Sequence, residues 1–212
     1  MSLTENAKFD VPASQLEPEA SVKVILAGKV VGLPTETVWG MACRWDDPKA
    51  VDEVYRRKGR EPGKPLQLLC ASVDAALAFV SPEDQAAARA LSAVWPGPLT
   101  LVVRSRNLPA YMAPGGLVGL RVPQDAATQA VLAALPGQAA AATSLNPAGE
   151  RPASTFEDAR AYLGGLIDHL HPGGTAAGLA SSVYLAAEHR LSREGAIPLA
   201  RVEDLLRQAG LA

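Results

Sequence analysis

Short apolar runs alternate with amphipathic and alanine-rich segments along most of this chain. Runs such as 30–34, 66–70 and 99–104 have the length and composition of buried strands. Between them, the segment 48–58 repeats apolar residues at i, i+3 and i+4 spacing, as a helix with one buried face does. Strands that alternate with helices of this length are typical of an α/β protein. We therefore predict an α/β fold.

The same patterns predict individual elements along the chain. Helices are predicted at 18–29, 48–58, 73–80, 82–94, 125–135, 155–163 and 202–208, and strands at 30–34, 66–70, 99–104, 117–122, 139–143, 166–170 and 182–186. Thr155 stands where the N-cap of a helix is expected. Because no repeat or linker divides the chain, we expect one domain over 16–208, with a polar extension at 1–15 and a tail at 209–212.

Composition excludes several classes of protein. The 212 residues carry a formal net charge of −2, which argues against a positive coat for wholesale nucleic-acid binding. Cys43 and Cys70 are far apart, so they indicate neither a zinc site nor a disulfide framework. No apolar run approaches the roughly 20 residues that cross a membrane, and the polar N-terminus is unlike a signal peptide. We expect a cytoplasmic protein that does not bind membranes.

Five cations fall within the nine residues from Arg56 to Lys64. Gly59 and the prolines that follow end the predicted helix, so Arg60 and Lys64 are expected on a loop before the strand 66–70. Arginine and lysine side chains on such a loop suit the negative charges of a triphosphate. The alternative is a solvated helix end whose cations complement the helix dipole.

A second candidate site begins where the strand 30–34 ends. Thr35 and Thr37 flank the carboxylate of Glu36, an arrangement that can hold a small polar ligand. The residues alone favour a simpler interpretation, which is a strand-to-helix turn with a threonine or glutamate cap.

A third candidate site follows the predicted strand 139–143. Thr143, Ser144 and Asn146 lead into a loop rich in proline and glycine, where hydroxyl, amide and backbone N–H groups can bind phosphate or ribose oxygens. An ordinary Asx or Ser turn is the alternative. Ser181 offers a hydroxyl of the same kind, with the same alternative.

Several common catalytic motifs are absent from the sequence. There is no P-loop, no Gly-x-Gly-x-x-Gly after a strand and no Gly-x-Ser-x-Gly nucleophile elbow. His169 and His171 share one face of a predicted strand, but no carboxylate stands at ligand spacing, so a metal held by the protein is not expected. The rigid Trp95-Pro96-Gly97-Pro98 run predicts a structural corner. These observations predict an anion or nucleotide site without naming a reaction.

The segment Pro34-Thr35-Glu36-Thr37-Val38-Trp39-Gly40 resembles the Pro-Thr-Glu-Thr-Val-Tyr-Gly signature of the YrdC/TsaC family. Further blocks resemble that family in the same order: Lys58-Gly59-Arg60 with Lys64-Pro65-Leu66, Trp95-Pro96-Gly97-Pro98-Leu99-Thr100, Gly119-Leu120-Arg121-Val122-Pro123, Ser144-Leu145-Asn146 with Gly149, Ser181-Ser182-Val183, and Arg193 before Gly195-Ala196-Ile197. Together these blocks are specific, and they cover roughly residues 16–208. The resemblance implies a single-domain, twisted open mixed sheet with flanking helices and a concave basic groove.

The resemblance also implies an activity, L-threonylcarbamoyladenylate synthase. The family condenses L-threonine with bicarbonate and adenylates the carbamate with ATP, releasing pyrophosphate, for the threonylcarbamoyladenosine modification of tRNA. Mg²⁺ is implied only as the companion of ATP, with no organic cofactor. Carried over by position, the ATP-binding residues would be Lys58, Arg60, Lys64, Ser144, Asn146 and Arg193, and the threonine-binding residues would be Thr37, Arg121, Ala142 and Ser181. No covalent nucleophile or general base is implied, and positioning would supply most of the rate. The implied partners are tRNA or double-stranded RNA and the proteins of the threonylcarbamoyl-transfer machinery.

The sequence departs from the family at a few positions. Leu69 stands where many members have a histidine and Leu117 replaces a usual hydroxyl, and both are expected to touch the ligand region. Milder changes are Ser182, Ala148 and His171-Pro172-Gly173. These departures leave an alternative interpretation open, in which the chain is a YrdC-fold paralogue that lacks synthase activity and binds RNA or another nucleotide. A carbamoyl-phosphate-using domain of hydrogenase-maturation proteins ranks third, because the zinc-finger and acylphosphatase regions found with it are not in this sequence.

Overall fold

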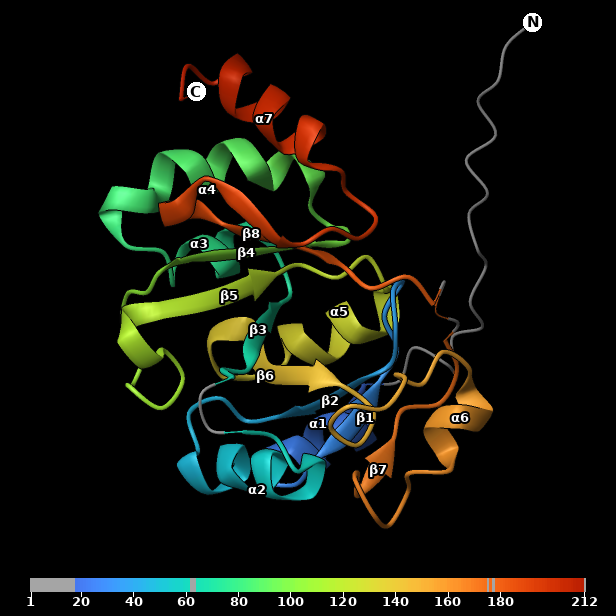
Figure 1. Cartoon of the computed structure of the whole chain (residues 1–212). Coiled ribbons are helices and arrows are strands. Elements are labelled where there is room, and N and C mark those ends of the chain that lie inside the picture. Colours follow the sequence, from blue (N-terminus) through green and yellow to red (C-terminus); the bar gives the residue numbers. More distant parts are fainter. Residues whose placement is uncertain (1–17, 62–63, 175, 177, 212) are drawn as a thin grey trace, which may run out of the picture.

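The computed structural model describes residues 18–61, 64–174, 176 and 178–211. The predicted polar extension at 1–15 lies outside these residues and stays a prediction. Within the described part of the chain, helices and strands alternate as expected, and they form one mixed sheet flanked by helices (Figure 1). The predicted α/β class is therefore confirmed. In the same residues, no helix is both long enough and apolar enough to span a bilayer.

The sheet runs in the order β7-β1-β2-β6-β3-β5-β4-β8-β9. Its strands are β1 (Val31–Leu33), β2 (Gly40–Cys43), β3 (Gln67–Cys70), β4 (Leu99–Arg104), β5 (Leu117–Arg121), β6 (Ala139–Ser144), β7 (His169–Leu170), β8 (Ser182–Leu185) and β9 (Arg190–Arg193). Three neighbouring pairs are parallel, namely β1 with β7, β3 with β5 and β4 with β8, and the other pairs are antiparallel. The sheet is thus mixed, as the family resemblance implies.

Helices cover both faces of this sheet. They are α1 (Glu19–Leu26), α2 (Pro48–Lys58), α3 (Val73–Leu77), α4 (Gln85–Leu91), α5 (Ala126–Ala133), α6 (Phe156–Arg160) and α7 (Leu199–Gln208). Residues of α2, α3, α4 and α7 belong to the larger buried cluster, whereas α1 and α5 contribute to a separate, smaller cluster. On β3, Leu68 and Cys70 lie in the first cluster and Leu69 in the second, because successive side chains of a strand point to opposite faces.

Helix α2 has both of the end signals that its sequence predicts. The side chain of Asp47 caps its first turn by accepting hydrogen bonds from the amides of Lys49 and Ala50, and Pro48 occupies the first turn. Gly59 ends the helix in the left-handed conformation, with φ of 65°, which costs glycine no side-chain clash. This stop directs Arg60 away from the helix and toward the end of β6, where it contacts Thr143. Thr155 likewise caps α6, through a capping box with Asp158.

The predicted elements are recovered, with several ends moved. The helix expected over 82–94 is shorter: a 3₁₀ turn at Pro82–Asp84 precedes α4, and another follows it. Asp84 is 6% exposed, and its carboxylate accepts from the backbone and side chain of Arg104, which holds this turn against β4. The strand expected over 166–170 is reduced to the two residues of β7, and α7 begins three residues earlier than expected.

Two strands have no counterpart among the predictions. The four residues of β2 are all buried, so no alternation of polar and apolar residues marks it. Strand β9 is a polar edge strand with arginine at both ends, and charges of this kind protect sheet edges from further pairing.

The strand-to-helix turn favoured for residues 35–37 is wrong. These residues connect β1 to β2, which pair antiparallel, and no helix follows them directly. The hydroxyl oxygen of Thr35 accepts from the amides of Thr37 and Val38, and its hydroxyl also donates to the carbonyl of Val38 at 2.6 Å. The turn is therefore closed by its own side chain, as in other turns built on threonine.

The structural corner predicted at residues 95–98 is present. Trp95 is 7% exposed, and its indole N–H donates to the carbonyl of Leu99 at 2.7 Å. The carbonyl of Gly97 accepts from the guanidinium of Arg121. The corner thus contacts Arg121 at the end of β5.

Candidate functional site

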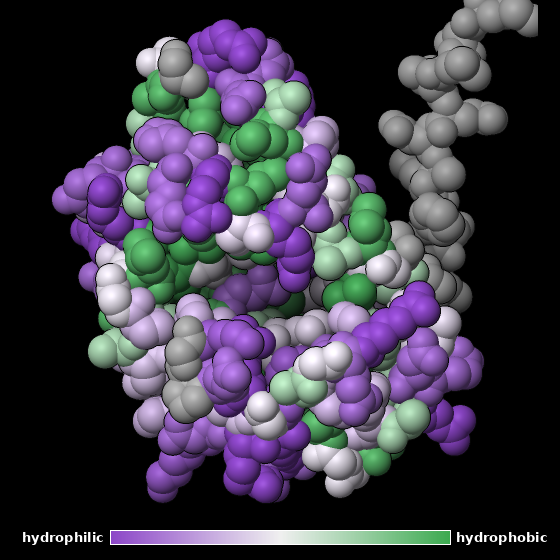
Figure 2. Space-filling model, viewed as in Figure 1, coloured by the Kyte–Doolittle hydropathy of each residue, from purple (hydrophilic) through white to green (hydrophobic). Residues whose placement is uncertain are grey.

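A cavity of about 570 Å³ opens on the sheet face that carries α1 and α5. On β3, Leu69 is covered by the smaller apolar cluster, while Gln67, two residues earlier on the same face, lines the cavity. The cavity therefore occupies the part of this face that the two helices leave open. The space-filling view shows it as a hollow in the middle of the molecule (Figure 2).

The floor of the cavity is built by neighbouring strands in register. Gln67 pairs with Ala142 of β6 on one side and with Gly119 of β5 on the other, and Gly119 pairs with Val102 of β4. All four residues line the cavity. Its floor is thus rigid sheet, while loop residues form much of its rim.

Arg121 lies at the end of β5 and is 3% exposed. Its Nη2 donates to Oε1 of Glu36 at 2.7 Å, and its Nε donates to the carbonyl of Gly97. The second carboxylate oxygen of Glu36 accepts from the amide of Gln124 at 3.0 Å. These contacts hold the guanidinium at the cavity with its plane fixed, so it can present its remaining N–H groups to an anion.

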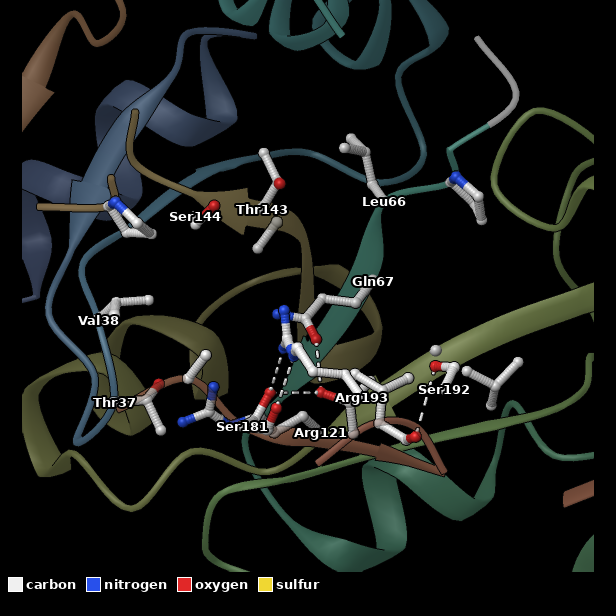
Figure 3. A pocket seen from close by; sticks show the side chains of 18 of the residues that line it. Thr37, Val38, Leu66, Gln67, Arg121, Thr143, Ser144, Ser181, Ser192 and Arg193 are labelled. Carbon is white, nitrogen blue, oxygen red and sulfur yellow. Dashed lines mark hydrogen bonds between the residues drawn. The ribbon is translucent and has the colours of Figure 1, made fainter. Parts of the chain in front are cut away.

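A chain of hydrogen bonds crosses the floor from β9 to β3 (Figure 3). Arg193 donates through Nε to the carbonyl of Ser181 at 2.9 Å and through Nη2 to its hydroxyl at 3.1 Å. The hydroxyls of Ser181 and Thr100 lie 3.1 Å apart, and Thr100 donates to Oε1 of Gln67 at 2.9 Å. Burial lowers the pKa of Arg193, and the positive charge of Arg121 lowers it further. A cation in such surroundings is stabilised when an anionic ligand arrives.

Lys58 supports one wall of the cavity from below. It is 4% exposed, and its ammonium group donates to the carbonyl of Asn146 at 2.8 Å, to Oδ1 of Asn146 at 2.9 Å and to the carbonyl of Ser144. Ser144 also donates to Oδ1 of Asn146 at 2.7 Å. Burial, together with the charge of Arg60, lowers the pKa of Lys58 to about 8. This lysine therefore fixes the loop that carries Ser144.

Arg60 lies between the loop after α2 and the end of β6. Its guanidinium donates to the carbonyls of Lys64 and Pro65 at 2.6 and 2.9 Å, and to the hydroxyl of Thr143 at 3.3 Å. Burial lowers its pKa. The side chain thus closes the loop onto the sheet and places a positive charge at the cavity.

The structure brings most of the expected site residues together. Seven of them line the cavity: Thr37, Arg60, Arg121, Ala142, Ser144, Ser181 and Arg193. Lys58 and Asn146 support the Ser144 loop, and Lys64 is 66% exposed in a 3.0 Å ion pair with Glu61. Geometry thus separates the ten residues into seven that line the cavity, two that support it and the exposed Lys64, and their binding roles stay predictions.

The two departures expected at the ligand region differ in position. Leu117 lines the cavity, as expected. For Leu69 the expectation is wrong, because this side chain is 1% exposed and packs with the cluster beneath α1 and α5. From β3, Gln67 reaches the cavity instead. The sequence signal for this residue is a glutamine at the start of an otherwise apolar strand. Burying its amide there costs free energy unless the amide forms hydrogen bonds, so such a residue is a candidate for a site.

The two histidines are not placed as a metal pair. A ring nitrogen of His171 lies 2.9 Å from the hydroxyl of Ser21, and His171 follows β7 rather than sharing the strand with His169. Across the described part of the chain, no three histidine, cysteine, aspartate or glutamate side chains form a metal-binding cluster. The cavity is lined instead by arginines, hydroxyls and an amide, groups that suit phosphate and carboxylate oxygens.

Comparison with known proteins gives consistent results. Residues 23–195 match the Sua5/YciO/YrdC family model, which is described as "Telomere recombination". Among curated proteins, the chain is 34% identical over 148 residues to the threonylcarbamoyl-AMP synthase of Cellvibrio japonicus, covering 69% of this chain and 78% of that protein. It is 36% identical over 151 residues to the enzyme of that name from Halorhodospira halophila, covering 69% of this chain and 77% of that protein.

Solved structures agree with this grouping. Pyrococcus abyssi Sua5, solved in complex with L-threonine, matches with a TM-score of 0.80 and 28% identity over 91% of this chain. The match spans only 58% of the P. abyssi protein. Escherichia coli YciO matches with a TM-score of 0.78 at 22% identity, covering 89% of this chain and 93% of that one, which supports the fold alone. By sequence and by fold, this chain belongs to the Sua5/YciO/YrdC family.

Proposed function

We propose that this chain is a threonylcarbamoyl-AMP synthase that joins L-threonine, bicarbonate and ATP. The observation that carries the proposal is the cavity, where Arg60, Arg121 and Arg193 meet the hydroxyls of Ser144 and Ser181. The curated relatives at 34% and 36% identity bear this name, and the P. abyssi Sua5 structure was solved with L-threonine.

The cavity divides into two regions that suit the two larger substrates. Thr37, Arg121 and Ser181 line the cavity, and Arg121 pairs with Glu36, the residue before Thr37. The fixed guanidinium of Arg121 suits the α-carboxylate of threonine. Arg60 and Ser144 lie where the loop after α2 meets the end of β6, and they suit the phosphates of ATP. Arg193 stands beside Ser181 and serves the nucleotide from the opposite wall, while Lys58 and Asn146 keep Ser144 in place. Lys64, the exposed residue before the cavity-lining Pro65, adds charge for the triphosphate.

The reaction needs positioning more than a reactive side chain. The amine of threonine attacks the carbon of bicarbonate, and loss of water leaves a carbamate. A carbamate oxygen then bonds to the α-phosphorus of ATP while the bond to the bridging oxygen of pyrophosphate breaks. Both partners are anions, so arginines placed around them reduce their repulsion and stabilise charge on the leaving group. We assign no general base.

Mg²⁺ would enter on the phosphates of ATP and reduce their charge. None of the described residues that line the cavity is an aspartate or glutamate, so the phosphates of ATP would supply most of the oxygen ligands of this ion. The residues that serve the reaction directly are therefore those that hold the phosphates and the threonine.

The product must be passed on, because the modification of tRNA is a separate transfer. We propose that the proteins of the threonylcarbamoyl-transfer machinery receive it, and that tRNA or double-stranded RNA is a secondary ligand of the cavity rim. The buried, unpaired thiols of Cys43 and Cys70 fit the reducing cytoplasm.

The deciding experiment is pyrophosphate release from ATP and Mg²⁺, with threonine and bicarbonate omitted in turn. A synthase releases pyrophosphate only when both are present. If ATP binds but no combination yields pyrophosphate, the chain is a paralogue in which the groove serves RNA or another nucleotide. RNA binding that needs no threonine and weakens steeply with salt would then identify the ligand class.

A further inference from the structure

Gln67 places a side-chain amide in the middle of the cavity floor. Its register partners are Ala142 and Gly119, and Arg121 lies two residues beyond Gly119 on the same face of β5. In Figure 3 its side chain extends toward Ser181 and Arg193 rather than away from the cavity. Gln67 thus stands between Ala142 and Arg121, two of the residues proposed to hold threonine.

The orientation of this amide is set by a directional chain of hydrogen bonds. The carbonyl oxygen Oε1 of Gln67 can only accept, so the single hydroxyl hydrogen of Thr100 is used on it, at 2.9 Å. The hydroxyl of Ser181, 3.1 Å from that of Thr100, therefore donates to Thr100 and accepts from Arg193. Because the guanidinium of Arg193 can only donate, every hydrogen bond in this chain is donated in the same direction, from Arg193 on β9 to Gln67 on β3.

Gly119 makes this chain possible. The side chains of Gln67 and Thr100 meet across β5, directly over Gly119. A Cβ atom at Gly119 would lie 3.2 Å from Cγ2 of Thr100, which is a tight contact, and 3.5 Å from Cβ of Gln67, which is an ordinary one, so a larger residue would displace Thr100 from its position beside Gln67. The bare backbone at this position keeps the amide in the cavity.

With Oε1 occupied, Gln67 presents Nε2 and its two N–H groups as donors. Among the described residues, this nitrogen has no hydrogen-bond partner, and the side chain lines the cavity. The charged groups around it, Arg121 and Arg193, complement the anionic parts of the substrates. A neutral amide donor adjacent to them suits a neutral oxygen.

We propose that Gln67 is a specificity-determining residue whose Nε2–H donates to the side-chain hydroxyl oxygen of the amino-acid substrate. This inference rests on the proposed function, since it names the group that distinguishes threonine from amino acids of the same shape. Valine is the sharpest comparison, because it replaces the hydroxyl by a methyl group of similar size. A site that hydrogen-bonds a hydroxyl leaves its own donor unpaired when the analogue lacks that group.

The test compares threonine and valine in direct binding to the wild type and to Gln67→Leu, by calorimetry with a non-hydrolysable ATP analogue present. The wild type is expected to bind valine up to about 100-fold more weakly than threonine, because valine leaves one buried donor unpaired. In Gln67→Leu, threonine binding should weaken about tenfold or more, while valine binding stays within about twofold of the wild type. Gln208→Leu, on the exposed part of α7, is the matched control and should preserve the wild-type ratio.

Gln67→Met keeps the length of the side chain but removes the N–H donors. If the leucine variant does not fold, the same threonine and valine affinities are measured on Gln67→Met. Thr100→Val removes the hydroxyl that orients the amide, so it should reduce the threonine-to-valine ratio by less than Gln67→Leu does. The proposal is overturned if both amino acids lose affinity equally, or if neither does. A wild type that binds no threonine would instead contradict the proposed function.

Discussion

Glu36 and Arg121 form an ion pair that joins the turn between β1 and β2 to the end of β5, at the inner floor of the cavity. Their Oε1–Nη2 distance is 2.7 Å, and the Arg121 side chain is only 4% exposed. The same carboxylate accepts from the amide of Gln124, just before α5. One acidic side chain therefore fixes three segments and the orientation of a guanidinium that faces the ligand.

Removing Glu36 should destabilise the fold and weaken threonine binding. Glu36→Ala leaves the buried guanidinium of Arg121 without its carboxylate partner, at a cost of about 1–3 kcal/mol in the free energy of unfolding. Urea denaturation measures this cost, and the Michaelis constant for threonine should rise more than the turnover number falls. Glu188→Ala is the control, because its pair with Arg190 is exposed and its loss should cost less than about 0.5 kcal/mol. Equal effects of the two substitutions would contradict the positioning role of Glu36.

The protonation of Lys58 should make nucleotide affinity depend on pH. Burial lowers its pKa to about 8, and only the charged form has three N–H groups for the oxygens of Ser144 and Asn146. Affinity for ATP should therefore fall as the pH rises through about 8. In Lys58→Arg the guanidinium stays charged, so this step should disappear. A step that persists in the arginine variant must come from another group.

The same lysine predicts an opposite trend in stability. The folded chain loses this proton near pH 8, whereas the unfolded chain keeps it up to the ordinary pKa of 10.5. Between these values the unfolded state binds more protons, so the contribution of Lys58 to the free energy of unfolding rises with pH. Urea unfolding of the wild type and of Lys58→Met from pH 7 to 10 isolates this contribution as the difference between the two curves.

Arg60 should matter for nucleotide binding more than the cations on the helix before it. Arg60→Ala removes a partly buried charge that lines the cavity, and affinity for an ATP analogue should fall at least about tenfold while the circular dichroism spectrum is retained. Arg56→Ala is the matched control, since Arg56 is 71% exposed and pairs with Glu53 on the surface of α2. If both variants bind the analogue as the wild type does, the cation cluster has no role in this site.

Gly195 should tolerate no side chain. A Cβ atom there would lie 2.2 Å from the carbonyl oxygen of Ala180 and under 3.0 Å from backbone atoms of Ser181 and Ser182, which cannot move independently. Gly195→Ala should therefore cost about 1–3 kcal/mol in unfolding free energy and weaken threonine binding by displacing Ser181. At Gly165 the nearest atom would be 3.7 Å away, so Gly165→Ala should change neither property. Thermal unfolding with and without threonine measures both effects.

Much of this protein follows from its sequence. The α/β class, the cap and stop of α2 at Asp47 and Gly59, and the cap of α6 at Thr155 are local properties, because each depends on residues within one turn. The blocks around Thr37, Arg60, Arg121, Ser144, Ser181 and Arg193 also identify the family and most of the residues that line the cavity.

The tertiary structure decided what no local pattern carries. Strand β2 shows no alternation of polar and apolar residues in the sequence, because both of its faces are buried by distant segments. Leu69 and Gln67 share a face of β3, yet only the positions of α1 and α5 determine that one lies in the core and the other in the cavity. Likewise, Lys58 points into the loop of Ser144, and Glu36 meets Arg121 across 85 positions of the chain. Residue type sets which contacts a side chain can make, but burial and partners depend on packing between segments that are remote in sequence.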